Sequence, residues 1–244
     1  MPERGILFKR EVVRAILEGR KTMTRRLAGL EKVNASPDYW RLRGPWVHAD
    51  GRSGMFFESS EGACICKPKF QPGDLLYIKE SYYLVDLPGM GDCPCLLYED
   101  EFEKYNTSDE TEYEKIRYSF PVRPWDGKKK FGHFSPLFMP KWAARIWLEV
   151  TAVRAERLQD ITEADAIKEG ARWRDFGKCG SGFQLPGWSM EDPFPESHAY
   201  CLNTARLAFA NYINKIHGGP NWNLKPENIW DRNDWVWAYT FKRI

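Results

Sequence analysis

The sequence predicts a mixed α+β fold, because segments typical of strands and segments typical of helices are both spread along the whole chain. Apolar residues recur at helical spacing near both ends, and alternating or continuous apolar runs between them are typical of strands. The two kinds of segment do not alternate regularly, as they would in a doubly wound parallel sheet. We therefore expect a small β-barrel with helices packed on it.

The composition is that of a folded chain. Hydrophobic residues make up 43% of the 244 residues and aromatic residues 15%, which is too much apolar material for a disordered protein. Basic and acidic residues nearly cancel, at 36 against 34, so no global field attracts a polyanion. The sequence contains no apolar run long enough to cross a membrane, and its start lacks the apolar core of a signal peptide. We expect a cytoplasmic protein without a membrane partner.

Three helices are predicted. Residues 6–18 are expected to form a short strand and then a helix, which ends at Gly19 because glycine favours the C-terminal position. Thr162 is expected to cap a short helix that stops at Gly170. The apolar stripe of Thr204–His217 predicts the third helix.

Three further strands are predicted. The turn at residues 72–74 leads into a buried strand over Leu75–Glu80, Trp142–Val153 alternates as a long strand, and Trp235–Phe241 alternates as a half-buried strand.

No linker, repeat or low-complexity tract divides the chain. We expect one domain over residues 1–244, with long irregular excursions at about residues 31–72, 86–136 and 172–200.

Two Cys-x-Cys pairs form a candidate zinc set, namely Cys64, Cys66, Cys93 and Cys95. Structural zinc sites usually separate their paired ligands by two to four residues, so this spacing favours free thiols. We expect no metal and no cofactor.

The segment from Gly19 to Arg26 is the best candidate for chemistry, since nucleophile-elbow, P-loop, dinucleotide and His-Glu-x-x-His motifs are all missing. Lys21 and Thr24 are close enough in sequence to meet in a turn. A neutral lysine can deprotonate a hydroxyl or a water, and a threonine hydroxyl can attack or orient. The segment's arginines would oppose protonation of Lys21 and hold an anion; they are Arg20, Arg25 and Arg26. The alternative is a basic helix end that complements the helix dipole.

Two more residues are candidates for substrate binding. Glu80 follows an apolar strand and would project into the mouth of a site, although exposed polar groups are common at strand ends. Tyr82 belongs to a set of aromatic residues in and near the excursions, on which a base would stack with about 1–3 kcal/mol each. Packing in the core explains such rings equally well.

These segments together resemble the ASCH family of the PUA-like superfamily. The resemblance rests on Gly19-Arg20-Lys21-Thr22-x-Thr24-x-Arg26 and on four later segments in the family's order. These segments are residues 72–80, 142–151 and 158–170 and the terminal strand up to Arg243. The layout is similar to that of longer ASCH proteins that phages and prophages encode.

The resemblance implies a small β-barrel with helices and long insertions, open at a cleft that suits a base or an RNA strand. Small bacterial members are N4-acetylcytidine amidohydrolases, whose catalytic Lys and Thr fall on Lys21 and Thr24. Their catalytic Glu lies seven residues after a threonine, and that count runs from Thr162 to Glu169 here.

The implied activity is hydrolysis of the exocyclic amide of an N4-acylated cytidine, a small nucleoside substrate. Lys21 would act as the base, and Glu169 would orient Lys21 or transfer the proton to the departing amine. Other ASCH proteins bind or cleave RNA. The alternatives are therefore a non-catalytic RNA- or DNA-binding module that recognises a modified base, and a ribonuclease.

Overall fold

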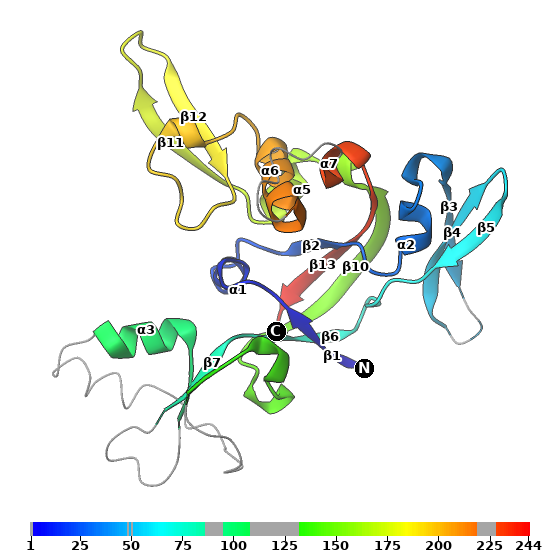
Figure 1. The fold of residues 1–244 in the computed structure, drawn as a ribbon, viewed down its shortest axis with the longest axis horizontal. Coiled ribbons are helices and arrows are strands. Elements are labelled where there is room, and N and C mark those ends of the chain that lie inside the picture. Colours follow the sequence, from blue (N-terminus) through cyan, green and yellow to red (C-terminus); the bar gives the residue numbers. More distant parts are fainter. Residues whose placement is uncertain (1, 48, 50, 86–94, 108–131, 219–227) are drawn as a thin grey trace. The chain divides into compact units, whose positions relative to one another are not determined.

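The computed structural model describes residues 2–47, 49, 51–85, 95–107, 132–218 and 228–244, and these residues form helices and four β-sheets (Figure 1). The predicted mixed α+β class is confirmed. Each sheet of the described residues is open, and none of them closes into a barrel. None of the described helices is long and apolar enough to span a membrane.

The chain divides into two compact units. The first contains residues 14–74 and 149–244, and the second contains residues 2–13 and 75–148. The chain passes between the units within helix α1 (Arg10–Leu17), after Asp74, and within strand β10 (Trp147–Arg157). That residues 1–244 form a single domain stays a prediction.

A group of long strands forms the centre of the first unit. Strand β13 (Trp235–Arg243) lies between β10 and β2 (Met23–Arg26), and β2 is at the edge of the sheet. Strands β2 and β13 are antiparallel, with Thr24 opposite Tyr239. The predicted terminal strand is confirmed. The predicted strand from Trp142 begins only at Trp147, because a 3-10 turn occupies Lys141–Ala143.

Short helices pack together in the first unit. Helix α5 (Glu163–Lys168) lies beside α6 (Ala205–Gly218), and α6 also contacts α7 (Ile229–Arg232), as Figure 1 shows. Thr162 caps α5 as predicted, since its hydroxyl accepts a hydrogen bond from Asp165 N at 3.1 Å. The buried faces of these helices form one apolar cluster with residues of β13 and of the segments that flank α5, and its members are Leu158, Ile161, Ala166, Ala171, Ala205, Phe209, Ile213, Ile229 and Val236.

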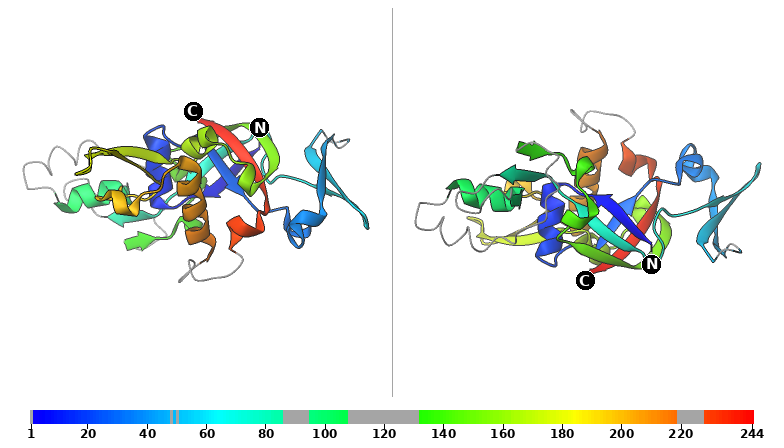
Figure 2. Two further views of the ribbon diagram at one scale, coloured as in Figure 1. Left: turned by 90° about the horizontal axis from the view of Figure 1, so that it is seen from above. Right: turned by 90° about the horizontal axis from the view of Figure 1, so that it is seen from below.

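Two predicted irregular excursions of the first unit contain regular structure. After helix α2 (Glu31–Asn34), the strands β3 (Arg41–Val47), β4 (Ser53–Ser59) and β5 (Gly62–Cys66) form an antiparallel sheet (Figures 1 and 2). Strands β11 (Arg172–Lys178) and β12 (Gln184–Ser189) form an antiparallel hairpin. The prediction of irregular backbone at residues 31–72 and 172–200 is wrong.

Proline and glycine within these strands explain that error. Pro45 lies in β3, which is an edge strand, and Pro186 lies in a two-stranded hairpin. Proline cannot donate a ladder hydrogen bond, and an edge strand tolerates it because one side of the strand is unpaired.

The second unit contains a parallel pair and a small antiparallel sheet. Strand β1 (Glu3–Leu7) pairs in parallel with β6 (Leu75–Lys79). Strand β7 (Tyr82–Val85) lies between β8 (Cys95–Tyr98) and β9 (Gly132–Phe134), and helix α3 (Glu99–Thr107) follows β8. Most of the predicted excursion at residues 86–136 lies outside the described residues.

Candidate active site

The end of helix α1 fixes the position of Lys21. The amide of Gly19 donates to Ile16 O at 3.0 Å and the amide of Arg20 to Ala15 O at 2.9 Å, which is the hydrogen-bond pattern of a Schellman motif. Gly19 has a φ of 72°, the left-handed conformation that this motif requires of its glycine. The amide of Lys21 also donates to Ala15 O, at 3.0 Å, so the backbone of Lys21 is held against the last turn of the helix.

The end of helix α5 positions Glu169 by the same motif. The amide of Gly170 donates to Ile167 O at 2.9 Å and that of Ala171 to Ala166 O at 3.1 Å, and Gly170 has a φ of 113°. Glu169 is the last residue before this glycine. The amide of Thr22 donates to Lys168 O at 2.9 Å, which ties the two helix ends together.

Lys21 and Glu169 form a buried, hydrogen-bonded pair. The Nζ of Lys21 donates to the Oε2 of Glu169 and, at 2.9 Å, to the main-chain oxygen of the same residue. Only 5% of the Lys21 side chain and 4% of the Glu169 side chain are exposed. The structure therefore brings together two of the three predicted catalytic residues, which are 148 positions apart in the sequence.

Burial lowers the pKa of Lys21 from its usual value of 10.5. The charge of Glu169 and its hydrogen bond act in the opposite direction, while the positive charges of Arg26 and Arg25 add to the lowering. This balance favours a neutral amine at a lower pH than in an exposed lysine.

Arg25 holds the other oxygen of the Glu169 carboxylate. Its Nη1 donates to Glu169 Oε1 at 3.0 Å, its Nε to Glu156 Oε1 at 2.8 Å, and its Nη2 lies 2.6 Å from that same Glu156 oxygen and 3.4 Å from Asp165 Oδ2. The side chain is 1% exposed, and its guanidinium lies 5.6 Å from the ring centre of Phe209. The predicted substrate-binding role of Arg25 therefore has no support, because every guanidinium nitrogen already has a carboxylate partner.

Arg154 completes this charged network. It donates to Glu156 Oε2 at 2.7 Å and to Asp165 Oδ2 at 2.6 Å, the two carboxylates that Arg25 also contacts. Sequence reasoning missed these residues. The alternation of Arg154 and Glu156 along a strand placed them on one face, but no local signal connected that face with Arg25.

Thr24 lies on β2, one residue before Arg25. Side chains alternate along a strand, so Thr24 and Arg25 point to opposite faces of β2. Thr24 is 5% exposed and faces the same side as its partner Tyr239, whose pKa burial raises to about 12. None of the hydrogen bonds among the described residues joins the Thr24 hydroxyl to Lys21 or Glu169, and its catalytic role stays a prediction.

The other two arginines of the segment differ in burial. Arg20 donates to Glu18 at 2.5 Å and is 27% exposed, so its guanidinium is accessible. Arg26 is half-buried, and this burial lowers the pKa of its guanidinium, while Glu169 and Tyr239 act in the opposite direction. Their predicted roles in substrate binding stay predictions.

Glu80 and Tyr82 belong to the second unit. Glu80 pairs with Arg145, whose Nη2 lies 2.8 Å from Glu80 Oε2, and burial raises the pKa of Glu80. Tyr82 is 1% exposed and stacks on Phe134, with 5.2 Å between ring centres. A role of either residue in substrate binding stays a prediction, to which this packing gives no support.

The cysteines show no zinc geometry in the described part of the chain. The Sγ atoms of Cys64 and Cys66 are 4.0 Å apart on β5, and burial raises the pKa of Cys66 to about 12. Cys95 lies on β8 of the second unit, and Cys93 lies outside the described residues. No group of three or more described His, Cys, Asp or Glu side chains is arranged to bind a metal.

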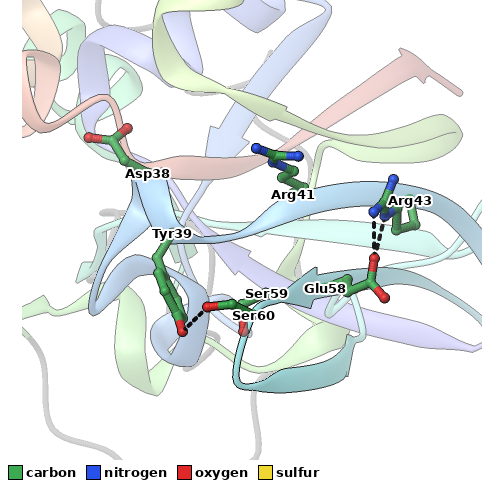
Figure 3. Close-up of a pocket in the computed structure, with 7 residues that line it drawn as sticks. All are labelled: Asp38, Tyr39, Arg41, Arg43, Glu58, Ser59 and Ser60. Carbon is green, nitrogen blue, oxygen red and sulfur yellow. Dashed lines mark hydrogen bonds and ion pairs between the residues drawn. The ribbon is translucent and has the colours of Figure 1, made fainter.

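A pocket of about 440 Å³ lies elsewhere in the first unit, beside β3 and β4 (Figure 3). Its acidic groups already have partners: Glu58 accepts from Arg43 at 2.6 Å, and Asp38 pairs with Arg157. Tyr39 shares a hydrogen bond of 2.7 Å with Ser60. The pocket contains none of the predicted catalytic residues.

Comparisons with models of protein families, with curated proteins and with solved structures give no match for this chain.

Proposed function

We propose that the protein is a cytoplasmic amidohydrolase that removes the acyl group from N4-acylated cytidine. The observation that carries the proposal is the buried hydrogen bond between Lys21 and Glu169, whose partners the ASCH resemblance selects as catalytic. A buried lysine with a lowered pKa beside a carboxylate is a typical arrangement for acid–base chemistry. We also propose that the fold of the protein belongs to the small PUA-like barrels with packed helices.

In the proposed reaction, neutral Lys21 removes a proton from a water molecule or from the Thr24 hydroxyl, and the oxygen attacks the acyl carbonyl carbon. The carbonyl π pair moves to the oxygen and returns as the carbon–nitrogen bond breaks. The leaving N4 atom receives the proton, directly from the Lys21 ammonium or through Glu169. With water as nucleophile the products are cytidine and a carboxylic acid. With Thr24 as nucleophile, cytidine leaves first, and one water molecule then hydrolyses the acyl-threonine ester to the carboxylic acid and free Thr24.

Glu169 would hold Lys21 through two acceptors, its carboxylate Oε2 and its main-chain oxygen. Such orientation fixes the direction of the Nζ lone pair when the amine is neutral. The same contacts also complement the negative end of the α5 dipole, which is a purely structural role for Lys21. Measured activity separates the two roles.

The direct test uses chromatography to measure whether the purified chain converts N4-acetylcytidine to cytidine and acetate. We expect turnover by the wild type and a loss of about 100-fold or more in kcat for Glu169→Gln, which keeps the shape but not the charge. Absence of cytidine above the uncatalysed rate with a panel of acyl groups would reject the proposal.

Thr24→Val distinguishes the two nucleophiles. If Thr24 attacks, the variant is inactive and the wild type accumulates an acyl-enzyme that mass spectrometry detects. If water attacks, the variant retains turnover. A wild type that binds oligonucleotides with a steep salt dependence but hydrolyses no acylcytidine would favour the nucleic-acid-binding alternative, and strand cleavage would identify a ribonuclease.

A further inference from the structure

Arg25 is buried, whereas the other two arginines of its segment are partly exposed. Its side chain is 1% exposed and contacts Glu169, Glu156 and Asp165. A guanidinium is charged at every accessible pH and cannot serve as an acid or a base. A group this deeply buried also has no free face for a substrate. Its influence on chemistry must therefore pass through the residues it touches.

The two oxygens of the Glu169 carboxylate are divided between two cations. Arg25 Nη1 binds Oε1 at 3.0 Å, and Lys21 binds Oε2. With Oε1 held by Arg25, the carboxylate has a fixed rotation and presents one oxygen to Lys21. The charge of Arg25 also partly neutralises Glu169, which weakens the stabilisation that Glu169 gives to the protonated amine.

We propose that Arg25 is a positioning residue, which orients Glu169 and, through its positive charge, disfavours the ammonium form of Lys21, rather than binding substrate. The inference rests on the proposed function for its catalytic meaning, and it adds a regulator of the base that the family resemblance does not assign. Glu156 on β10 and Asp165 on α5 accept hydrogen bonds from Arg25, so these two carboxylates help to hold Arg25 against Glu169.

The charged groups that face Lys21 determine in which direction each substitution should shift the pKa of Lys21. Glu169 on the end of α5 favours the ammonium, and Arg25 and Arg26 on β2 oppose it. Removing the charge of Arg25 should raise the pKa of Lys21. Removing the charge of Glu156 should lower it, because Arg25 then interacts more strongly with Glu169 and a negative charge near the site is lost.

The test is a pH titration of the Lys21 side chain by NMR in protein labelled with ¹³C at lysine Cε, with the signal assigned by its absence in Lys21→Met. In Arg25→Gln the midpoint should rise by about one pH unit. In Glu156→Gln it should fall. Arg154→Gln is the matched control, because Arg154 contacts Glu156 and Asp165 but makes no contact with Glu169. The midpoint of Lys21 should shift in this variant by less than half as much as in Arg25→Gln.

A Lys21 midpoint that stays at the wild-type value in Arg25→Gln would overturn the inference, as would an equal shift in Arg154→Gln. Should Arg25→Gln fail to fold, Glu156→Gln decides: it is nearly isosteric, and a midpoint that is unchanged or higher contradicts the proposed coupling. In an active enzyme, Arg25→Gln should lower kcat and leave KM within about twofold, whereas a substrate-binding arginine would raise KM.

The titration needs no substrate, so the positioning role of Arg25 can be rejected independently of the amidohydrolase activity. A wild type without hydrolysis rejects the amidohydrolase and leaves the Lys21 titration to be judged by itself. An active wild type whose Lys21 midpoint does not respond to Arg25 rejects only the positioning role.

Discussion

Lys21 combines burial with direct contact to a carboxylate, and the two effects oppose each other. Burial is the largest effect and disfavours the ammonium, Glu169 favours it, and the positive charges of Arg26 and Arg25 add to the lowering of the pKa of Lys21. An exposed lysine would be protonated at neutral pH and would have no lone pair to accept a proton. The lowered pKa is thus the property that makes Lys21 suitable as a base.

The pH dependence of hydrolysis follows from this lowered pKa. We expect kcat/KM to rise with pH as Lys21 loses its proton, and to level off at a pH below 10.5, the usual lysine value. Initial rates with N4-acetylcytidine across a pH series measure this rise of kcat/KM. A rate that falls as pH rises through this range would contradict a neutral Lys21.

Stability should depend on the same titration. The folded-state pKa of Lys21 is lower than its unfolded value of 10.5, so between the two values the unfolded chain binds more protons. The free energy of unfolding should therefore rise with pH in this window, by at most about 1.4 kcal/mol per pH unit. Below the lowered pKa, Lys21 is protonated in both the folded and the unfolded state, and its buried positive charge then destabilises the folded protein by the full amount.

Lys21→Met tests this linkage by urea denaturation over a pH series. The variant should lack the rise that the wild type shows in the window, while Lys242→Met, a substitution of an exposed lysine, should keep it. Parallel curves for wild type and Lys21→Met would mean that the pKa of Lys21 is not lowered.

At the scale of elements, two helix ends with the same motif create the site. Gly19 ends α1 two residues before Lys21, and Gly170 ends α5 directly after Glu169. Both glycines have left-handed backbone angles, and their Schellman hydrogen bonds fix where the chain turns. The site geometry therefore depends on these turns as well as on the side chains that meet there.

Alanine at either glycine should reduce both stability and activity. A left-handed φ costs a non-glycine residue about 1–2 kcal/mol, and the space around Gly19 contains nothing within 4 Å of an added Cβ, so strain rather than a clash is the cause. Gly177→Ala is the matched control, because Gly177 also has a positive φ with free space but lies in the β11–β12 hairpin. Urea denaturation should show similar losses for Gly19→Ala and Gly177→Ala. Only Gly19→Ala should lower kcat. Equal kcat values for Gly19→Ala and Gly177→Ala would contradict the role of the Gly19 turn in positioning Lys21.

At the scale of the whole molecule, local patterns predicted the elements better than their assembly. The helix ends at Gly19 and Gly170 and the cap at Thr162 were predictable because each depends on a few neighbouring residues. The β3–β5 sheet was not, because its ladder partners, rather than its own proline and glycine content, stabilise it. Similarly, the contact of Arg25 with Glu156 joins residues 131 positions apart and has no local signature.

The proposed reaction needs only side chains of the protein and water, so metal removal should not change it. We expect protein dialysed against a chelator to hydrolyse N4-acetylcytidine at the rate of untreated protein, and elemental analysis to find no stoichiometric zinc. Activity that is lost with the chelator and restored by zinc would contradict a purely side-chain mechanism and would direct attention to the Cys-x-Cys pairs.

In the proposed amidohydrolase, a neutral Lys21 held by Glu169 acts as the base. The most direct measurement is kcat for N4-acetylcytidine in Lys21→Arg, which can still donate a hydrogen bond to Glu169 but carries a permanent positive charge and cannot be deprotonated. Lys242→Arg, at an exposed lysine, is the matched control and should keep the wild-type rate. We predict a loss of about 100-fold or more for Lys21→Arg in a folded protein. Hydrolysis at the wild-type rate in that variant would contradict this role of Lys21.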